Sequence, residues 1–178
     1  ILLGYSSEEA YMLLPKTNPY VPGDISIFNT LVSAGEEKSC IALPYHLRGF
    51  LVDCLVEHVR DREIVHTVLA LSLLHSAEKL GEQGNVLLKQ TGDGALLLAG
   101  LFPERALRLH VSSRYFRFIG QTAYTNLAAK FQVTGRPERG KFYNAVATHF
   151  HLLEKVLDAA RVRTSEWELF RRFRVSLE

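Results

Sequence analysis

Residues 64–80 of the chain read IVHTVLALSLLHSAEKL, and this stretch decides the expected fold. Apolar side chains lie on almost every side of the helix that these residues would form. A helix that is apolar all round belongs in the middle of a protein, with other helices packed about it. We therefore expect residues 64–80 to form the central helix.

Helical patterns continue on both sides of that stretch. Between Pro44 and Val59, apolar residues recur at spacings of three and four, which is typical of a helix with one buried face. We expect further helices over residues 114–131, 138–161 and 165–175. Residues 25–34, closed by Gly35, form another segment, which is either helix or strand. Because no stretch shows convincing strand alternation, the sequence predicts an all-α bundle of about six to eight helices.

The chain of 178 residues has the length of one domain, so residues 1–178 are expected to form a single helical domain. Residues 15–24 contain three prolines and a glycine, which predicts an extended connecting segment. No run of uncharged apolar residues approaches the ~18 that indicate a membrane span. No membrane association is therefore expected.

Two cysteines, Cys40 and Cys54, are expected to lie in apolar surroundings as reduced thiols. Small secreted proteins that depend on disulfides contain more cysteine than this. The sequence therefore favours a cytoplasmic protein in which these two residues are not linked.

The segment from Thr91 to Tyr124 places small residues among large apolar ones. The run Thr91-Gly-Asp-Gly94 is expected to interrupt the helical pattern, with Asp93 capping the helix that follows. Further along, Gly120 and Ala123 share one helix face, where a neighbouring backbone is expected to approach closely. The polar residues of this segment are the candidate pocket: Asp93, Arg114, Tyr115 and Tyr124.

Two parts of this segment together resemble a set of uncharacterised bacterial proteins. The first part is Gly92-Asp93-x-Ala95-Leu96-x-x-x-Gly100-Leu101-Phe102-Pro103, and the second is Tyr115-Phe116-x-x-x-Gly120-x-x-Ala123-Tyr124. The resemblance implies a bacterial, cytoplasmic protein. It carries no fold, activity or catalytic residues with it.

One pair of residues has the spacing of metal ligands. Glu63 and His66 form Glu-x-x-His, which places a carboxylate and an imidazole on one helix face, as in di-iron bundles. Glu57, with His58 and Asp61 beside it, is close enough in sequence to complete such a site. A di-iron bundle uses this motif twice, however, and no second copy is present. A solvated charged corner is the plainer interpretation, and no cofactor is expected.

The net charge of +2 is unevenly distributed, because residues 101–178 contain 14 Lys and Arg against 7 Asp and Glu. The arginines near the end of the chain are a candidate basic surface: Arg163, Arg171, Arg172 and Arg174. Arginine pairs with phosphate, and aromatic residues can stack on bases. The neighbouring Trp167, Phe170 and Phe173 are spaced for a helix that docks on a core, so nucleic-acid binding is not expected.

No nucleophile elbow, dinucleotide fingerprint or phosphate loop is present in the sequence. We therefore expect a module that binds a protein partner or a second copy of itself, without catalytic activity. One alternative is a bundle that binds a small molecule or a metal and could be an enzyme. A second alternative is nucleic-acid binding through the C-terminal arginines.

Overall fold

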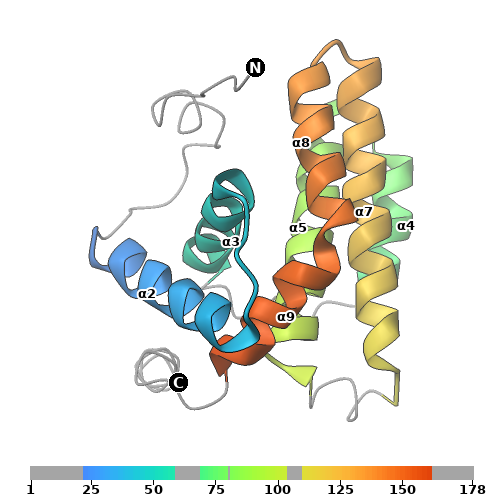
Figure 1. Cartoon of the computed structure of the whole chain (residues 1–178). Helices are drawn as coiled ribbons and strands as arrows, with labels where there is room; N and C mark the ends of the chain where they lie inside the picture. Colours follow the sequence, from blue (N-terminus) through green and yellow to red (C-terminus); the bar gives the residue numbers. More distant parts are fainter. Residues whose placement is uncertain (1–21, 59–68, 80, 104–109, 162–178) are drawn as a thin grey trace.

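The computed structural model describes residues 22–58, 69–79, 81–103 and 110–161, and every regular element in these ranges is a helix. The all-α fold class is thereby confirmed. The helices, shown in Figure 1, are α2 (Pro22–Ser39), α3 (Tyr45–His58), α4 (Leu69–Glu78), α5 (Gly81–Gly100), α7 (Ser113–Val133), α8 (Pro137–Thr148) and α9 (Phe150–Arg161). Residues 15–21 of the expected extended segment lie outside the described residues, and Pro22 already belongs to α2. None of the described helices is both long enough and apolar enough to cross a membrane.

The centre of the fold is α5, which packs against α4, α7 and α9. Every residue from Thr91 to Gly100 is buried. In Figure 1, α4, α5, α7 and α8 stand side by side, while α2 and α3 lie apart from them and α9 runs beneath. The helix α9 joins the two groups, since it packs on both α2 and α5.

The prediction that residues 64–80 form the central helix is wrong for the part that the structure describes. That part is α4, and two of its leucines face solvent, with Leu71 52% and Leu74 64% exposed. The composition of the two helices explains the error. The buried helix α5 contains glycine, threonine and aspartate at its centre. Because these residues are not apolar side chains, a search for the most apolar stretch of sequence does not select α5 as the central helix.

The run Thr91-Gly-Asp-Gly94 does not interrupt a helix, because α5 continues through it. Asp93 is therefore an interior residue of α5, not the cap of a shorter helix. The packing of Gly92 gives the physical reason for this glycine. A Cβ atom at this position would lie 2.5 Å from Cε1 of Tyr124, so the Tyr124 ring can pack on α5 only if the side chain is absent.

The close helix crossing expected at Gly120 is confirmed. A Cβ atom on Gly120 would lie 2.4 Å from the Phe150 ring and 3.1 Å from the Cβ atom of Ala95. Gly120 thus lets α7 approach both α5 and the first residue of α9.

Residues 138–161 do not form the single helix that was expected. The chain breaks at His149 into α8, which packs on α7, and α9, which turns away to pack on α2 and α5. A carbonyl within α8 holds the imidazole at the break, because His149 Nδ1 lies 2.9 Å from the backbone oxygen of Ala145. An apolar stripe runs through both helices, so the sequence pattern does not reveal the change of direction.

The expected stop at Gly35 is also wrong, because α2 runs on to Ser39. Gly35 instead marks the contact between α2 and α9, where its Cβ atom would lie 2.4 Å from the carbonyl oxygen of Val156. Beyond α2 the chain turns at Cys40, which has a left-handed φ of 53°. Cys40 is exposed, contrary to expectation, whereas Cys54 is buried, and both thiols are free.

Candidate functional site

Asp93 is a carboxylate in the middle of the central helix, and none of its surface is exposed. Water therefore reaches neither of its oxygens, and an isolated charge in such a place would be strongly destabilising. Three side chains from three helices surround it: Lys89 from α5, His58 from α3 and Tyr124 from α7. We call these four residues the Asp93 cluster.

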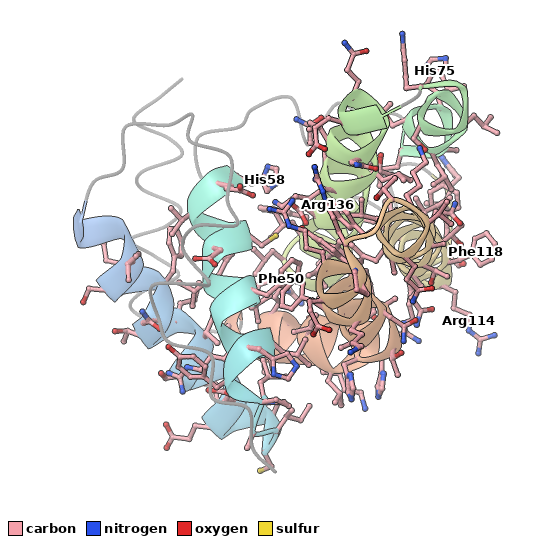
Figure 2. The ribbon with its side chains drawn as sticks, turned by 90° about the horizontal axis from the view of Figure 1, so that it is seen from above. Phe50, His58, His75, Arg114, Phe118 and Arg136 are labelled. Atoms are coloured by element: carbon pink, nitrogen blue, oxygen red, sulfur yellow. The ribbon has the colours of Figure 1, made fainter. Side chains whose placement is uncertain are left out.

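Both oxygens of Asp93 accept short hydrogen bonds. The Tyr124 hydroxyl donates to Oδ1 at 2.7 Å, and the Lys89 ammonium donates to Oδ2 at 2.7 Å. His58 Nε2 lies 3.0 Å from the same Oδ2. Because an ionised carboxylate only accepts hydrogen bonds, His58 Nε2 carries the proton and donates it. Figure 2 shows His58 pointing from the end of α3 toward α5.

The charges of the cluster stabilise one another. Burial alone would raise the pKa of Asp93, but the positive charge of Lys89 and the hydrogen bond from His58 hold that pKa well below its usual range. Burial likewise acts to lower the pKa values of His58 and Lys89, and the Asp93 carboxylate outweighs it and raises both. Asp93 and Lys89 are therefore a charged pair inside the protein.

Two carboxyl groups of α3, those of Glu57 and Asp53, lie at the outer edge of this cluster. The Lys89 ammonium also donates to Glu57 Oε2, and the Glu57 side chain is 33% exposed. Burial raises the pKa of Asp53 to about 6, with a smaller contribution from the charge of Glu57. Glu57 and Lys89 form the rim through which the cluster meets solvent, since the other members are almost fully covered.

An aromatic group surrounds the inner end of the cluster. The ring of Tyr124 contacts Phe50 at a centroid distance of 5.8 Å, Tyr143 at 6.1 Å and Phe150 at 6.2 Å. Rings of this kind exclude water and leave a low dielectric, which strengthens every electrostatic interaction nearby. The cluster is thus polar at its centre, apolar on its inner side and wet only at its rim.

A third kind of donor atom lies within the cluster. The thiol of Cys54, one turn before His58 on α3, is fully covered by neighbouring atoms. Potential ligand atoms of Cys54, His58 and Asp93 all lie within 4.8 Å of one another. Sulfur, imidazole nitrogen and carboxylate oxygen together are the donors that zinc and its neighbours among the transition metals use.

Of the candidate pocket, the structure brings Asp93 and Tyr124 together but leaves the other two residues elsewhere. Arg114 is exposed and, in Figure 2, points away from the cluster. Tyr115 packs on Phe116, with the ring centroids 5.4 Å apart. Tyr115 and Tyr124 are nine positions apart on one helix, which is about 13.5 Å along the axis at 1.5 Å per residue.

Of the three candidate metal ligands, only Glu57 belongs to the part of the chain that the structure describes. Glu57 is at the rim of the Asp93 cluster, where it pairs with Lys89. Glu63 and His66 lie outside the described residues, as does the candidate basic surface: Arg163, Arg171, Arg172 and Arg174. His149 is half-buried, and its imidazole has a backbone partner in the carbonyl oxygen of Ala145.

Sequence reasoning missed Lys89 and Cys54 as parts of a site. Two spacings in the sequence pointed to them, because Lys89 with Asp93 and Cys54 with His58 are each four residues apart and so share a helix face. The first spacing was hidden by the assumption that Gly92 and Gly94 end a helix. No protein family, curated protein or solved structure matches the chain.

Proposed function

We propose that the protein is a binding protein whose ligand occupies the Asp93 cluster between α3, α5 and α7. The observation that carries this proposal is the ionised, fully buried Asp93 in the middle of the central helix. A buried ion network often contributes less stability than apolar residues of the same volume would. Ionisable groups with shifted pKa values are common at functional sites, where proteins keep residues that lower the stability of the fold but serve the function.

The composition of the cluster supports a ligand that is small and polar. The cluster offers hydrogen-bond donors from Lys89 and His58, acceptors from Asp93 and Glu57, and a thiol from Cys54. The exposed edge at Glu57 and Lys89 is the route by which a ligand would enter.

Thermal unfolding of the full chain with candidate ligands tests this proposal. Divalent metal ions, inorganic phosphate and citrate are added one at a time to the wild type, to Asp93→Asn and to His58→Gln. A ligand that binds only the folded protein stabilises it by about 2.7 kcal/mol at 100 times its Kd. We expect at least one ligand to raise the unfolding midpoint of the wild type, but not that of either cluster variant.

The matched control is Asp158→Asn, which changes an exposed aspartate on α9 and should respond as the wild type does. The proposal is wrong if no ligand raises the wild-type midpoint, or if the cluster variants respond equally.

A second candidate function, binding to a protein partner or to a second copy of the chain, rests on the exposed leucines of α4. Leu71 and Leu74 are three residues apart, so they share the outer face of that helix. Sedimentation of the wild type against a variant with Leu71→Ser and Leu74→Ser tests this function. Self-association that is lost in the variant supports it, and a monomer in both rules out the homo-oligomer.

The cellular setting that we propose is a bacterial cytoplasm. The free thiols of Cys40 and Cys54 support a reducing compartment, and the resemblance of residues 92–124 to bacterial proteins supports the source.

A further inference from the structure

We infer that the ligand of the Asp93 cluster is a divalent transition-metal ion of the zinc type, bound by Cys54 Sγ, His58 Nε2 and Asp93 Oδ2. This inference rests on the proposed function and gives its ligand a chemical class. The ligand atoms of these three side chains already lie within 4.8 Å of one another. They come from α3 and α5, whose buried residues belong to one core cluster.

The distances between these atoms are close to those of a metal site. Zinc bonds to sulfur at about 2.3 Å and to nitrogen or oxygen at about 2.0–2.1 Å, so neighbouring donors of a tetrahedral site are about 3.3–3.8 Å apart. His58 Nε2 and Asp93 Oδ2 are 3.0 Å apart, and Cys54 Sγ lies within 4.8 Å of a ring nitrogen of His58 and of a carboxylate oxygen of Asp93. Shifts of about 1 Å in the positions of the donor atoms would complete the site, and ordinary side-chain rotations give shifts of this size.

The position of Lys89 supports a cation at this point of the structure. Its ammonium group donates to Asp93 Oδ2 and to Glu57 Oε2 at once, so a positive charge already bridges two carboxylates, one of which is a proposed metal ligand. The Lys89 side chain is 19% exposed at the rim, so its flexible stem can carry the charge outward into water. Glu57 would then be free to supply a fourth ligand, or a water molecule could take that position.

When the His58 imidazole is neutral, the exchange of Lys89 for a metal conserves the charge of the cluster. One ammonium charge leaves the cluster, two charges arrive with the metal, and the Cys54 thiol loses one proton to solvent when its sulfur binds. The proton on His58 Nε2 likewise passes to solvent if the imidazole is cationic, and moves to Nδ1 if it is neutral. A metal and the ammonium group of Lys89 would therefore compete for Asp93 Oδ2.

Cobalt titration of the EDTA-treated full chain tests this inference, because a Co²⁺–thiolate bond gives a charge-transfer band in the near ultraviolet. We expect one equivalent of Co²⁺ to produce a saturable band that Zn²⁺ abolishes. Cys54→Ser should remove the band, while Cys40→Ser, which changes the exposed thiol, should keep it. His58→Gln should weaken binding at least tenfold, and His75→Gln, on the exposed face of α4, should not.

Lys89→Met provides the second line of evidence, and it is independent of the ligand variants. Removal of the competing ammonium should tighten Co²⁺ binding at least tenfold, whereas loss of a residue that only supports the fold would weaken it. Circular dichroism of each variant verifies that it remains helical.

The inference is overturned if neither the wild type nor Lys89→Met shows a saturable band, or if Cys40→Ser removes the band and Cys54→Ser does not. If phosphate or citrate stabilises the wild type through Asp93 while Co²⁺ does not bind, the metal inference fails and the proposed function stands. If the binding of no tested ligand depends on Asp93, the metal inference and the proposed function are both wrong.

Discussion

The hydroxyl of Tyr124 on α7 donates a hydrogen bond of 2.7 Å to Oδ1 of Asp93 on α5, across 31 residues of sequence. Gly92, the residue before Asp93, has no side chain to keep the Tyr124 ring at a distance. The glycine and the aspartate thus act together, since Gly92 leaves space for the Tyr124 ring and Asp93 accepts the hydrogen bond from its hydroxyl. This relationship places an ionised group at the centre of the core.

Tyr124→Phe removes that hydroxyl and keeps the ring. One oxygen of a fully buried carboxylate then loses its donor, which should lower the free energy of unfolding by about 1–3 kcal/mol. Urea denaturation measures the change. The control is Tyr45→Phe, where the ring is 80% exposed and a change within about 0.5 kcal/mol is expected. Equal effects at the two positions would show that Asp93 does not depend on Tyr124.

Gly120→Ala should destabilise the protein, because the added Cβ atom would lie 2.4 Å from the Phe150 ring. Overpacking of this kind costs about 1–3 kcal/mol. The matched control is Gly49→Ala in α3, where nothing lies within 4 Å of the new atom. There the helix should gain about 0.5–1 kcal/mol from the loss of glycine. A stabilised Gly120→Ala protein would show that α7 and α9 are not in close contact.

The fold class and the crossing at Gly120 could be predicted from the sequence, because both follow from local spacing. The Asp93 cluster could not, because His58 and Asp93 are 35 residues apart and belong to different helices. The glycines at 92 and 94 added a second obstacle. Glycine ordinarily weakens a helix, and only the packing of Tyr124 reveals why α5 tolerates it here. The bend at His149 likewise depends on which partners α8 and α9 find.

Asp53→Asn should stabilise the metal-free protein at pH 7.5 and leave it unchanged near pH 3. The pKa of Asp53 is about 6 in the folded chain, against an ordinary value of 3.8, so the folded state holds its proton more tightly. The stability due to this group is complete below about pH 4 and is lost as the pH rises through 6. Above pH 7 the ionised side chain is half-buried beside Glu57, and asparagine relieves about 1–2 kcal/mol.

Denaturation of the wild type and Asp53→Asn across this pH range gives the difference between the two proteins. A difference that does not change with pH would contradict the assigned cause, because other groups titrate equally in both.

Cys40→Gly should raise the free energy of unfolding by about 0.5–1 kcal/mol. Cys40 has a φ of 53°, in the left-handed region, which costs a residue with a side chain about 1–2 kcal/mol. The reverse change at Gly135, where φ is 74° and the space is open, should destabilise the protein when alanine replaces glycine. Denaturation midpoints of the two variants should therefore move in opposite directions, and a parallel shift would disprove the account of these turns.

The central claim is that the Asp93 cluster exists to bind a ligand and not to hold the fold together. The most direct measurement is the free energy of unfolding of the metal-free chain in which apolar residues replace the cluster, with His58→Leu, Lys89→Met, Asp93→Leu and Tyr124→Phe combined. We predict a helical protein at least as stable as the wild type, since buried ion networks are often neutral or unfavourable against apolar groups of similar volume. It should also have lost the response to ligand. A variant that fails to fold, or that loses several kcal/mol, would contradict the claim and assign the cluster a structural role.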